Sequence, residues 1–190
     1  GISNGGALLN SSSAAASYAG LVSLGAASTI VGGTGAIALS NTGTLVGGGF
    51  ALTLGGAQGG SIASIIDTTT ASVTKQDAGT WTLSGANSYS GANTVSTGTL
   101  RAGSASAFGS GTISVVSGAA LDLNGQTMTS TGALTLRGTG ISSAGALRNS
   151  SATGATYAGL ITLGADSAIM ADTGTIALSN TGTIAGATFG

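Results

Sequence analysis

Apolar and polar residues alternate along this chain in short clusters, for example at residues 36–39, 50–54, 80–83 and 133–136. Successive side chains of a strand point to opposite faces, so each cluster predicts a short strand with one apolar face. Gly, Asn and Ser residues separate the clusters, in pairs such as Asn124-Gly125, and predict tight turns. The pattern therefore predicts an all-β fold.

The chain also repeats itself over a long distance. Residues 1–50 return as residues 140–189 without a gap, and 31 of the 50 positions are identical. A long internal period indicates an array in which each unit stacks on its neighbour. We therefore assign residues 1–139 to one full repeat unit and residues 140–190 to the start of the next. Because the chain begins at Gly1, we expect it to be a piece of a longer protein.

Two architectures fit such short strands, a β-sandwich and a parallel β-helix. A sandwich does not predict a near-identical return after so long a period, whereas a β-helix does. With roughly 20 residues per rung, one unit makes on the order of seven rungs. We therefore predict a parallel β-helix in which residues 1–50 superpose on residues 140–189 after translation along one axis.

The amino-acid composition argues against several classes of function. The chain has 36 Gly residues, no Pro, Cys or His, and a net charge of −1 from nine charged side chains. Nucleic acid binding depends on clustered Lys and Arg, which are missing. Without His or Cys there is no Ser-His or Cys-His pair, no ordinary zinc site and no disulfide. We therefore predict neither an enzyme nor a cofactor.

The middle of the chain, residues 72–125, carries a recognisable motif. Its characteristic positions are Lys75, Gly79, Thr82, Leu83, Ser84, Gly85, Asn87, Tyr89, Ser90, Gly91, Thr94, Val95, Gly98, Thr99 and Leu100. With these residues the segment resembles the autotransporter-associated β-strand repeat, also called the passenger-associated transport repeat. The chain departs from the repeat's pattern at Asp77, where Gly is usual, and at Trp81, where Leu is commoner.

This resemblance implies a secreted passenger region of the bacterial type V class, built as a right-handed parallel β-helix and displayed at the cell surface. Such repeats are thought to assist passage through the outer membrane, because each added rung buries apolar surface. The resemblance also implies a membrane-embedded transport barrel as a partner, outside this chain. Members of the group are often long adhesins.

Few residues offer chemistry, and each has a structural alternative. Asp67, Lys75 and Asp77 could form a carboxylate-lysine active site, but one short cluster without support favours a solvated turn. Asp172 lies in a Gly-containing turn that superficially resembles a calcium-binding repeat, and a plain turn is the simpler interpretation. Trp81 and Tyr89 could stack on sugar rings, although edge packing or capping of a rung is the favoured interpretation of both.

Asn and Thr residues also recur. Asn10 and Asn149 occupy equivalent places in the repeat, as do Asn41 and Asn180, and we expect turn or ladder positions for all four. The Thr-x-Thr elements are irregularly spaced in the sequence. That spacing argues against a flat threonine face for ice or another crystal.

These observations favour a non-enzymatic stalk segment of a large surface-displayed adhesin. The alternative is a passenger that binds glycans or surfaces through exposed aromatic residues or Asn and Thr rows. Partners would then be host or abiotic surfaces, glycans or sister rods. Because a β-helix cut between rungs leaves unpaired backbone groups, we also expect end-to-end self-association.

Overall fold

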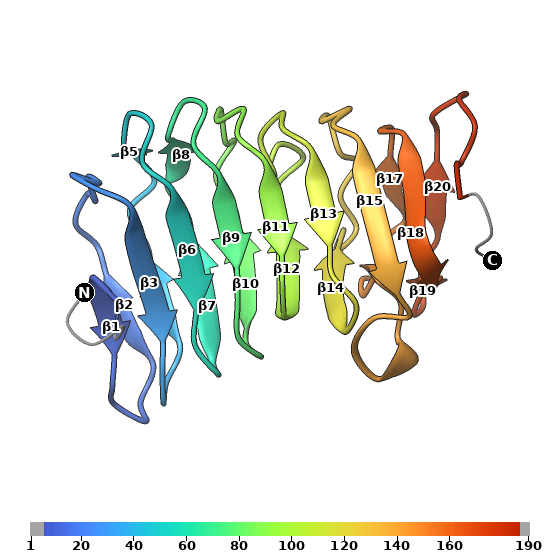
Figure 1. Ribbon diagram of the computed structural model, residues 1–190. Coiled ribbons are helices and arrows are strands. Elements are labelled where there is room, and N and C mark those ends of the chain that lie inside the picture. Colours follow the sequence, from blue (N-terminus) through green and yellow to red (C-terminus); the bar gives the residue numbers. More distant parts are fainter. Residues whose placement is uncertain (1–5, 187–190) are drawn as a thin grey trace.

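Twenty short strands coil around one axis in the computed structural model, which describes residues 6–186. All strand pairs are parallel, and the coil makes about eight turns. Strands β1 and β20, the first and last of the chain, lie at opposite ends of the coil (Figure 1). The prediction of an all-β, parallel β-helix is confirmed.

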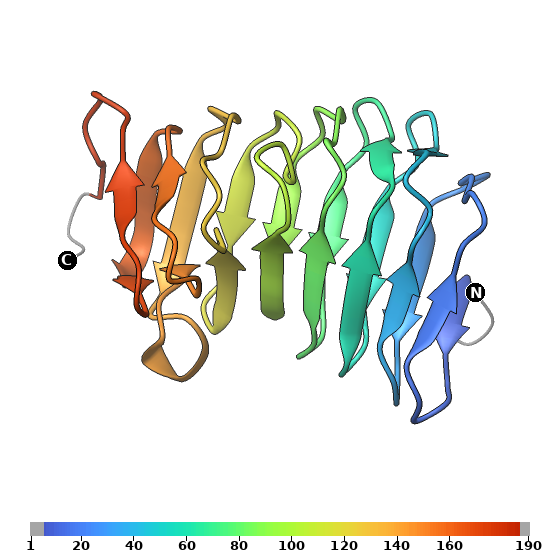
Figure 2. The ribbon, with the colours of Figure 1, turned by 180° about the vertical axis from the view of Figure 1, so that it is seen from behind.

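Two eight-stranded sheets form the long faces of the coil. The first sheet lies in front in Figure 1 and the second in Figure 2. The first sheet contains β1 (Leu8–Asn10), β3 (Ser28–Gly32), β6 (Leu52–Gly55), β9 (Val73–Lys75), β11 (Asn93–Val95), β13 (Ile113–Val115), β15 (Leu134–Gly138) and β18 (Ile161–Ser167). The second sheet contains β2 (Ala16–Tyr18), β4 (Ile37–Leu39), β7 (Gly59–Ile62), β10 (Thr80–Leu83), β12 (Gly98–Ala102), β14 (Ala119–Asp122), β16 (Leu147–Asn149) and β19 (Ile169–Ala171).

A third, less regular face carries the chain from the second sheet back to the first. Two strand pairs lie on it: β5 (Thr44–Val46) with β8 (Ile65–Asp67), and β17 (Ala155–Tyr157) with β20 (Ile176–Leu178). Within residues 6–186 the helical structure is limited to the three-residue 3₁₀ turn η2 (Ile141–Ser143). No helix in this range is therefore long and apolar enough to span a bilayer.

The core follows from the alternation of side chains along each strand. In β6, Leu52 and Leu54 are buried while Thr53 between them points outward, and most strands of the first sheet repeat this pattern. Because the strands are in register, inward side chains stack on their equivalents in the next turn. The result is one narrow, continuous core of Leu, Ile, Val and Ala along the coil.

The two copies of the repeat begin on different faces of the coil. Strand β1 belongs to the first sheet, whereas its equivalent in the second copy, β16, belongs to the second sheet. In the same way β2 lies in the second sheet and its equivalent β17 on the third face. Six further strands of the first sheet follow β1 before β16 begins. One repeat therefore advances the coil by six turns plus one face.

This geometry corrects the expectation that the copies superpose by translation alone, because a rotation by one face is also required. The physical reason is that the length of one repeat unit does not divide into whole turns. Strands β1 and β16 share their inward Leu and Asn residues and differ only in the outward residue between them, so either sheet accommodates this alternation. The coil itself continues through the boundary between the two copies, since β15 pairs with β18 and β14 with β16.

Candidate functional site

Trp81 and Tyr89, the two candidate glycan contacts, are fully buried. Trp81 points inward from β10, and its indole Nε1 donates a hydrogen bond to the carbonyl oxygen of Gly55 at 3.0 Å. Its strand neighbour is Gly60, and a Cβ at Gly60 would lie 3.1 Å from the indole ring. Glycine thus leaves the space that the ring fills. Neither ring has a face on which a sugar can stack, so the alternative of a glycan contact at these two residues is wrong.

Tyr89 belongs to a buried polar network at the corner that precedes β11. Its hydroxyl donates to Asn93 Oδ1 at 2.6 Å, and Asn93 Nδ2 donates to the carbonyl oxygen of Phe108 at 2.8 Å. Burial raises the pKa of the Tyr89 phenol, so the hydroxyl stays protonated and remains a donor. The network joins one turn of the coil to the next at a place without strand pairing.

Asn87 connects three successive turns at the same corner. Its Oδ1 accepts from the backbone N–H of Ile66 in the preceding turn at 2.8 Å. Its Nδ2 donates to the carbonyl oxygen of Ala107 in the following turn at 2.6 Å. An amide suits this place because it carries a donor and an acceptor on one side chain. These contacts stabilise a corner whose backbone groups would otherwise be buried without partners.

Lys75, the single lysine of the sequence, is buried at the opposite corner, at the end of β9. Its ammonium group donates to three carbonyl oxygens: Gln76 at 2.7 Å, Asp77 at 2.6 Å and Thr97 at 2.9 Å. Desolvation lowers the pKa of Lys75 to about 8, and the negative charge of Asp77 acts in the opposite direction. The ammonium group therefore holds two consecutive turns together.

Gly98 leaves room for this ammonium group. Its φ of +70° favours glycine, and a Cβ there would lie 2.6 Å from Lys75 Nζ. Asp77 also has a positive φ, and its carboxylate accepts from the backbone N–H of Gly56 at 2.7 Å. Both polar groups of the proposed Lys75–Asp77 cluster thus bind backbone atoms of the coil.

Residues 73–102 match the family model of the passenger-associated-transport-repeat. The match confirms the resemblance over β9 to β12, the segment that contains Lys75, Asn87, Tyr89 and Asn93. The family implies a secreted, surface-exposed protein. No curated protein and no solved structure matches the chain.

The transport repeat therefore uses its most recognisable side chains inside the coil. Asp67, the third residue of the cluster considered for catalysis, lies on β8 on the third face. Within the described part of the chain it forms no ion pair. The three residues do not form a common polar site.

The recurring asparagines occupy equivalent turns in both copies. Asn10 Nδ2 donates to the carbonyl oxygens of Ala14 and Ala36, and Asn149 Nδ2 donates to the equivalent Thr153 and Thr175. A second pair, Asn41 and Asn180, each accepts from the backbone N–H of the residue two positions later and donates to the preceding turn of the coil. Each amide thus fixes its own turn and connects it to a neighbouring turn.

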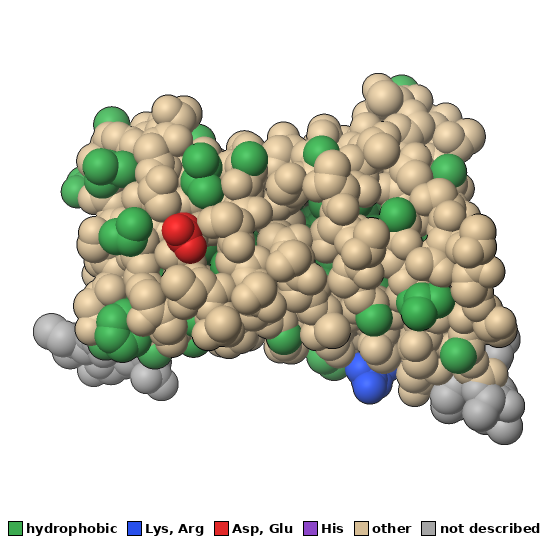
Figure 3. All heavy atoms as spheres, turned by 90° about the horizontal axis from the view of Figure 1, so that it is seen from above, with side chains coloured by type: hydrophobic (Ala, Val, Ile, Leu, Met, Phe, Trp, Pro, Cys, Tyr) green, Lys and Arg blue, Asp and Glu red, His purple; other side chains and the backbone are tan. Residues whose placement is uncertain are grey.

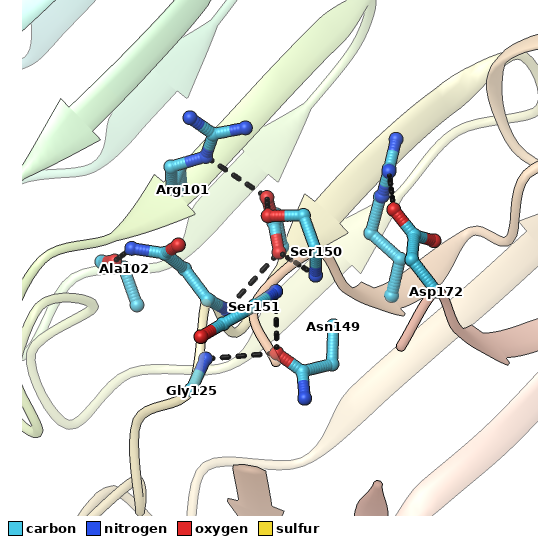
Figure 4. Close-up of polar contacts among 10 residues, drawn as sticks. Arg101, Ala102, Gly125, Asn149, Ser150, Ser151 and Asp172 are labelled. Atoms are coloured by element: carbon cyan, nitrogen blue, oxygen red, sulfur yellow. Dashed lines mark hydrogen bonds and ion pairs between the residues drawn. The ribbon is translucent and has the colours of Figure 1, made fainter. Parts of the chain in front are cut away.

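Charged residues that looked scattered in the sequence form a row on the second sheet (Figure 4). Arg101 on β12, Asp122 on β14 and Arg148 on β16 are consecutive register partners, and Arg148 also pairs with Asp172. The signs alternate along the row, which avoids the repulsion of stacked like charges. Asp172, the candidate calcium residue, is therefore engaged by an arginine. No group of three acidic side chains able to hold a metal ion occurs in residues 6–186.

Asp122 is the centre of this row and is fully buried. Its carboxylate accepts from Arg101 Nε at 2.9 Å, from the Ser150 hydroxyl at 2.6 Å and from the Ser150 backbone N–H at 3.0 Å. It also accepts from the backbone N–H of Asn124 at 3.0 Å. Four hydrogen bonds compensate the loss of water around the charge.

Replacing Asp122 by alanine is expected to destabilise the coil by about 1–3 kcal/mol, since buried N–H donors lose their acceptor. Arg101→Ala is expected to cost about 1 kcal/mol or less, because the Arg101 side chain is 37% exposed and water can replace its partner. Urea unfolding of the two single variants and the double variant measures both effects. Equal losses in the two single variants would contradict the central role of Asp122.

Threonines form a second row that the sequence concealed. Each strand of the first sheet after β1 contributes one outward residue, and the register places these residues side by side along the coil. The row consists of Thr29, Thr53, Thr74, Thr94, Ser114, Thr135 and Thr162. All seven are exposed or half-buried.

The irregular Thr-x-Thr spacing in the sequence did not reveal this row, because the row takes one residue from each turn. Its members mostly lie between two apolar residues, as in Leu52-Thr53-Leu54. The apolar-Thr-apolar pattern marks only Thr53, Thr135 and Thr162, so a search for it would have found part of the row. Parallel strands are about 4.8 Å apart, so the row is regular in space although its spacing in sequence varies.

Proposed function

We propose that the chain is a non-enzymatic stalk segment of a large surface-displayed bacterial passenger, in which stacked turns extend a rod and support secretion. The observation that carries this proposal is the unbroken stacking of about eight turns around one core. The transport repeat contributes buried side chains that join these turns, namely Lys75, Asn87, Tyr89 and Asn93.

The surface of the coil supports the same proposal. Figure 3 shows a face made mostly of uncharged polar side chains and backbone, with scattered hydrophobic groups and few charged ones. A surface with so few charged groups attracts charged molecules only weakly. A spacer that has to carry a binding tip away from the cell benefits from this property.

The stalk function can be tested by varying the number of repeats. Passengers with one, two or three copies of residues 1–139 are placed between an epitope tag and an outer-membrane transport barrel. We expect the tag to move outward by about 30 Å per copy, because each copy adds six turns plus one face and each turn rises about 4.8 Å. Electron microscopy of gold-labelled tags measures the distance. An equal distance for all three proteins would refute the stalk.

A second experiment removes the hydrogen bonds of Asn87 between turns without changing the number of turns in the rod. Asn87→Ala in every copy should reduce the number of displayed tags per cell, because turns that stack poorly give less driving force for passage. Ser88→Ala is a suitable comparison, since the Ser88 side chain is exposed, forms no hydrogen bond within the described residues and lies next to Asn87 in the chain. Equal display of the two variants would argue against support of secretion by the repeat.

A second candidate function is binding of a glycan or a solid surface, and the threonine row favours it. Seven hydroxyl-bearing side chains in register provide regularly spaced donors and acceptors on one sheet. Retention on insoluble polysaccharides, mineral particles and ice tests this function. Replacing Thr74, Thr94 and Thr135 by lysine should abolish specific retention, whereas the same changes at Ser61, Thr82 and Ser17 of the second sheet should not. Equal retention of both triple variants would remove this candidate.

A further inference from the structure

Among the described residues, 6–186, the N-terminal end of the coil has a hollow of about 380 Å³ that faces solvent. Apolar side chains line most of it: Leu8, Tyr18, Leu21, Val22, Leu24 and Ile30. Tyr18 is 45% exposed and Leu21 is 59% exposed. An apolar surface of this kind commonly marks a place where another protein segment packs.

The internal repeat contains part of this surface in a covered state, because the equivalents of Leu8, Tyr18 and Val22 are buried there, whereas Leu160, the equivalent of Leu21, stays 46% exposed. Leu147 and Tyr157 are the equivalents of Leu8 and Tyr18, and both are completely buried. The Tyr157 hydroxyl donates to the carbonyl oxygen of Gly132 in the preceding turn at 2.6 Å. The same tyrosine is thus exposed in one copy and buried in the other, and the difference is the turn that precedes it.

The covering turn consists of residues 119–136. Strand β14 pairs with β16 and places Leu121 beside Leu147. Strand β15 pairs with β18 and places Leu134 beside Ile161, the equivalent of Val22. Between these two strands, Thr127 forms a β-bridge with the residue that precedes Tyr157. Backbone pairing and apolar contact therefore extend around the whole turn.

The polar contacts to the covering turn can also form at the N-terminal end. Asn149 Oδ1 accepts from the backbone N–H of Gly125 at 2.8 Å, and the Ser150 hydroxyl donates to Asp122. The equivalent residues are Asn10 and Ser11, with identical side chains. The surface around Leu8 therefore carries the hydrogen-bonding groups as well as the apolar side chains that this turn requires.

We propose that the N-terminal face of the coil is a docking surface for a turn with the sequence of residues 119–139, supplied by another repeat unit that continues directly into Gly1. This proposal deepens the stalk function and rests on it for its role at the cell surface. In this chain β14 pairs with β16 in the second sheet. The equivalent strand of the preceding unit would pair with β1 in the first sheet, because each repeat advances the coil by six turns plus one face. Successive units then present the threonine row on successive faces of the rod.

The test adds a second copy of residues 98–139 directly before Gly1 of the full chain. This addition contains no tyrosine, so Tyr18, Tyr89 and Tyr157 remain the only sites of tyrosine nitration. In the original chain we expect tetranitromethane to modify Tyr18 and to spare the two buried tyrosines. In the extended chain the rate at Tyr18 should fall by about tenfold or more, toward that of Tyr157, because exposure then requires local opening. Mass spectrometry of tryptic and chymotryptic peptides gives the rate at each tyrosine.

A matched control carries Leu121→Asp and Leu134→Asp in the added copy alone, and its Tyr18 should react as in the original chain. Slow nitration of Tyr157 shows in every protein that the original coil is folded. Rapid nitration of Tyr18 in the extended chain, with Tyr157 still protected, would overturn the proposal. The proposal would also be overturned if protection of Tyr18 in the unextended chain rose with protein concentration and the added residues did not change it. That result would show that a second molecule of the chain covers this surface. Because the experiment uses purified protein, its failure is distinguishable from a failure of the rod to extend on cells.

Discussion

Replacing Lys75 by methionine is expected to lower the free energy of unfolding by about 2–4 kcal/mol at pH 7, although methionine has a similar length and is more apolar. The reason is the ammonium group, which satisfies three buried carbonyl oxygens at 2.6–2.9 Å. Methionine leaves these oxygens without donors, and each unpaired buried group costs roughly 1–3 kcal/mol. The removed cost of burying a charge offsets part of this loss.

The pH dependence separates this contribution from simple packing. The pKa of Lys75 is lowered from 10.5 to about 8 in the folded chain, so between these values the unfolded chain binds more protons. The stability of the wild type relative to Lys75→Met should therefore rise as pH increases from 8 to 10.5, by on the order of 3 kcal/mol. Urea unfolding of both proteins at several pH values measures the difference.

Two further features make this measurement interpretable. Tyr89 and Tyr157 have raised pKa values in the folded chain, which lowers stability above about pH 10 in both proteins and cancels in the difference. Gln76→Ala is a useful control, because Lys75 uses the backbone carbonyl of Gln76 and not its side chain. A difference between wild type and Lys75→Met that does not change with pH would contradict the buried ammonium.

Replacing Trp81 by alanine is expected to destabilise the coil by about 3–5 kcal/mol, the usual cost of removing a large buried aromatic side chain. The cavity cannot collapse easily, because backbone hydrogen bonds on both sides fix β10 between β7 and β12. The fall in thermal or urea midpoint measures the effect. In the wild type, the single tryptophan should also fluoresce at short wavelength and be insensitive to added sugars, since the ring is fully buried.

Trp81→Phe distinguishes packing from hydrogen bonding at this position. It keeps an aromatic ring but loses the Nε1 hydrogen bond to the carbonyl oxygen of Gly55. We expect this loss to lower the free energy of unfolding by about 1–2 kcal/mol, and the cavity to be smaller than in Trp81→Ala. The complementary variant Gly60→Val should destabilise strongly as well, because its Cβ would meet both the ring and the carbonyl oxygen of Ile37. A stability of Trp81→Ala close to that of the wild type would show that the ring is not part of the core.

The rotation by one face per repeat has a consequence for any surface site of the rod. A residue of one unit and its equivalent in the next unit lie on neighbouring faces, as Leu9 on the first sheet and Arg148 on the second illustrate. A series of such units would display each repeated feature around the rod. Binding through the threonine row would then depend on the number of units that face the target at the same time.

The sequence determined the class of fold. Period-two clusters such as Leu52-Thr53-Leu54 specify which side chains point inward, and the long internal repeat specifies stacking in one direction. The segment from Lys75 to Leu100 also carried enough of its pattern to identify a transport repeat, which the match to residues 73–102 confirmed. These features are local, because alternation and turn chemistry act between residues close in the chain.

Only the tertiary structure decided which residues meet across turns. Asp122 becomes the acceptor for Arg101 and Ser150 because the coil places residues of successive turns side by side, and turn lengths vary. Small differences in turn length also rotate the second copy by one face and align the threonines into a row. Alternation likewise left the environment of Trp81 undetermined, because its burial depends on the space at Gly60 in the neighbouring turn. The register between neighbouring turns depends on the lengths of all the loops of the coil, and no single local sequence pattern determines it.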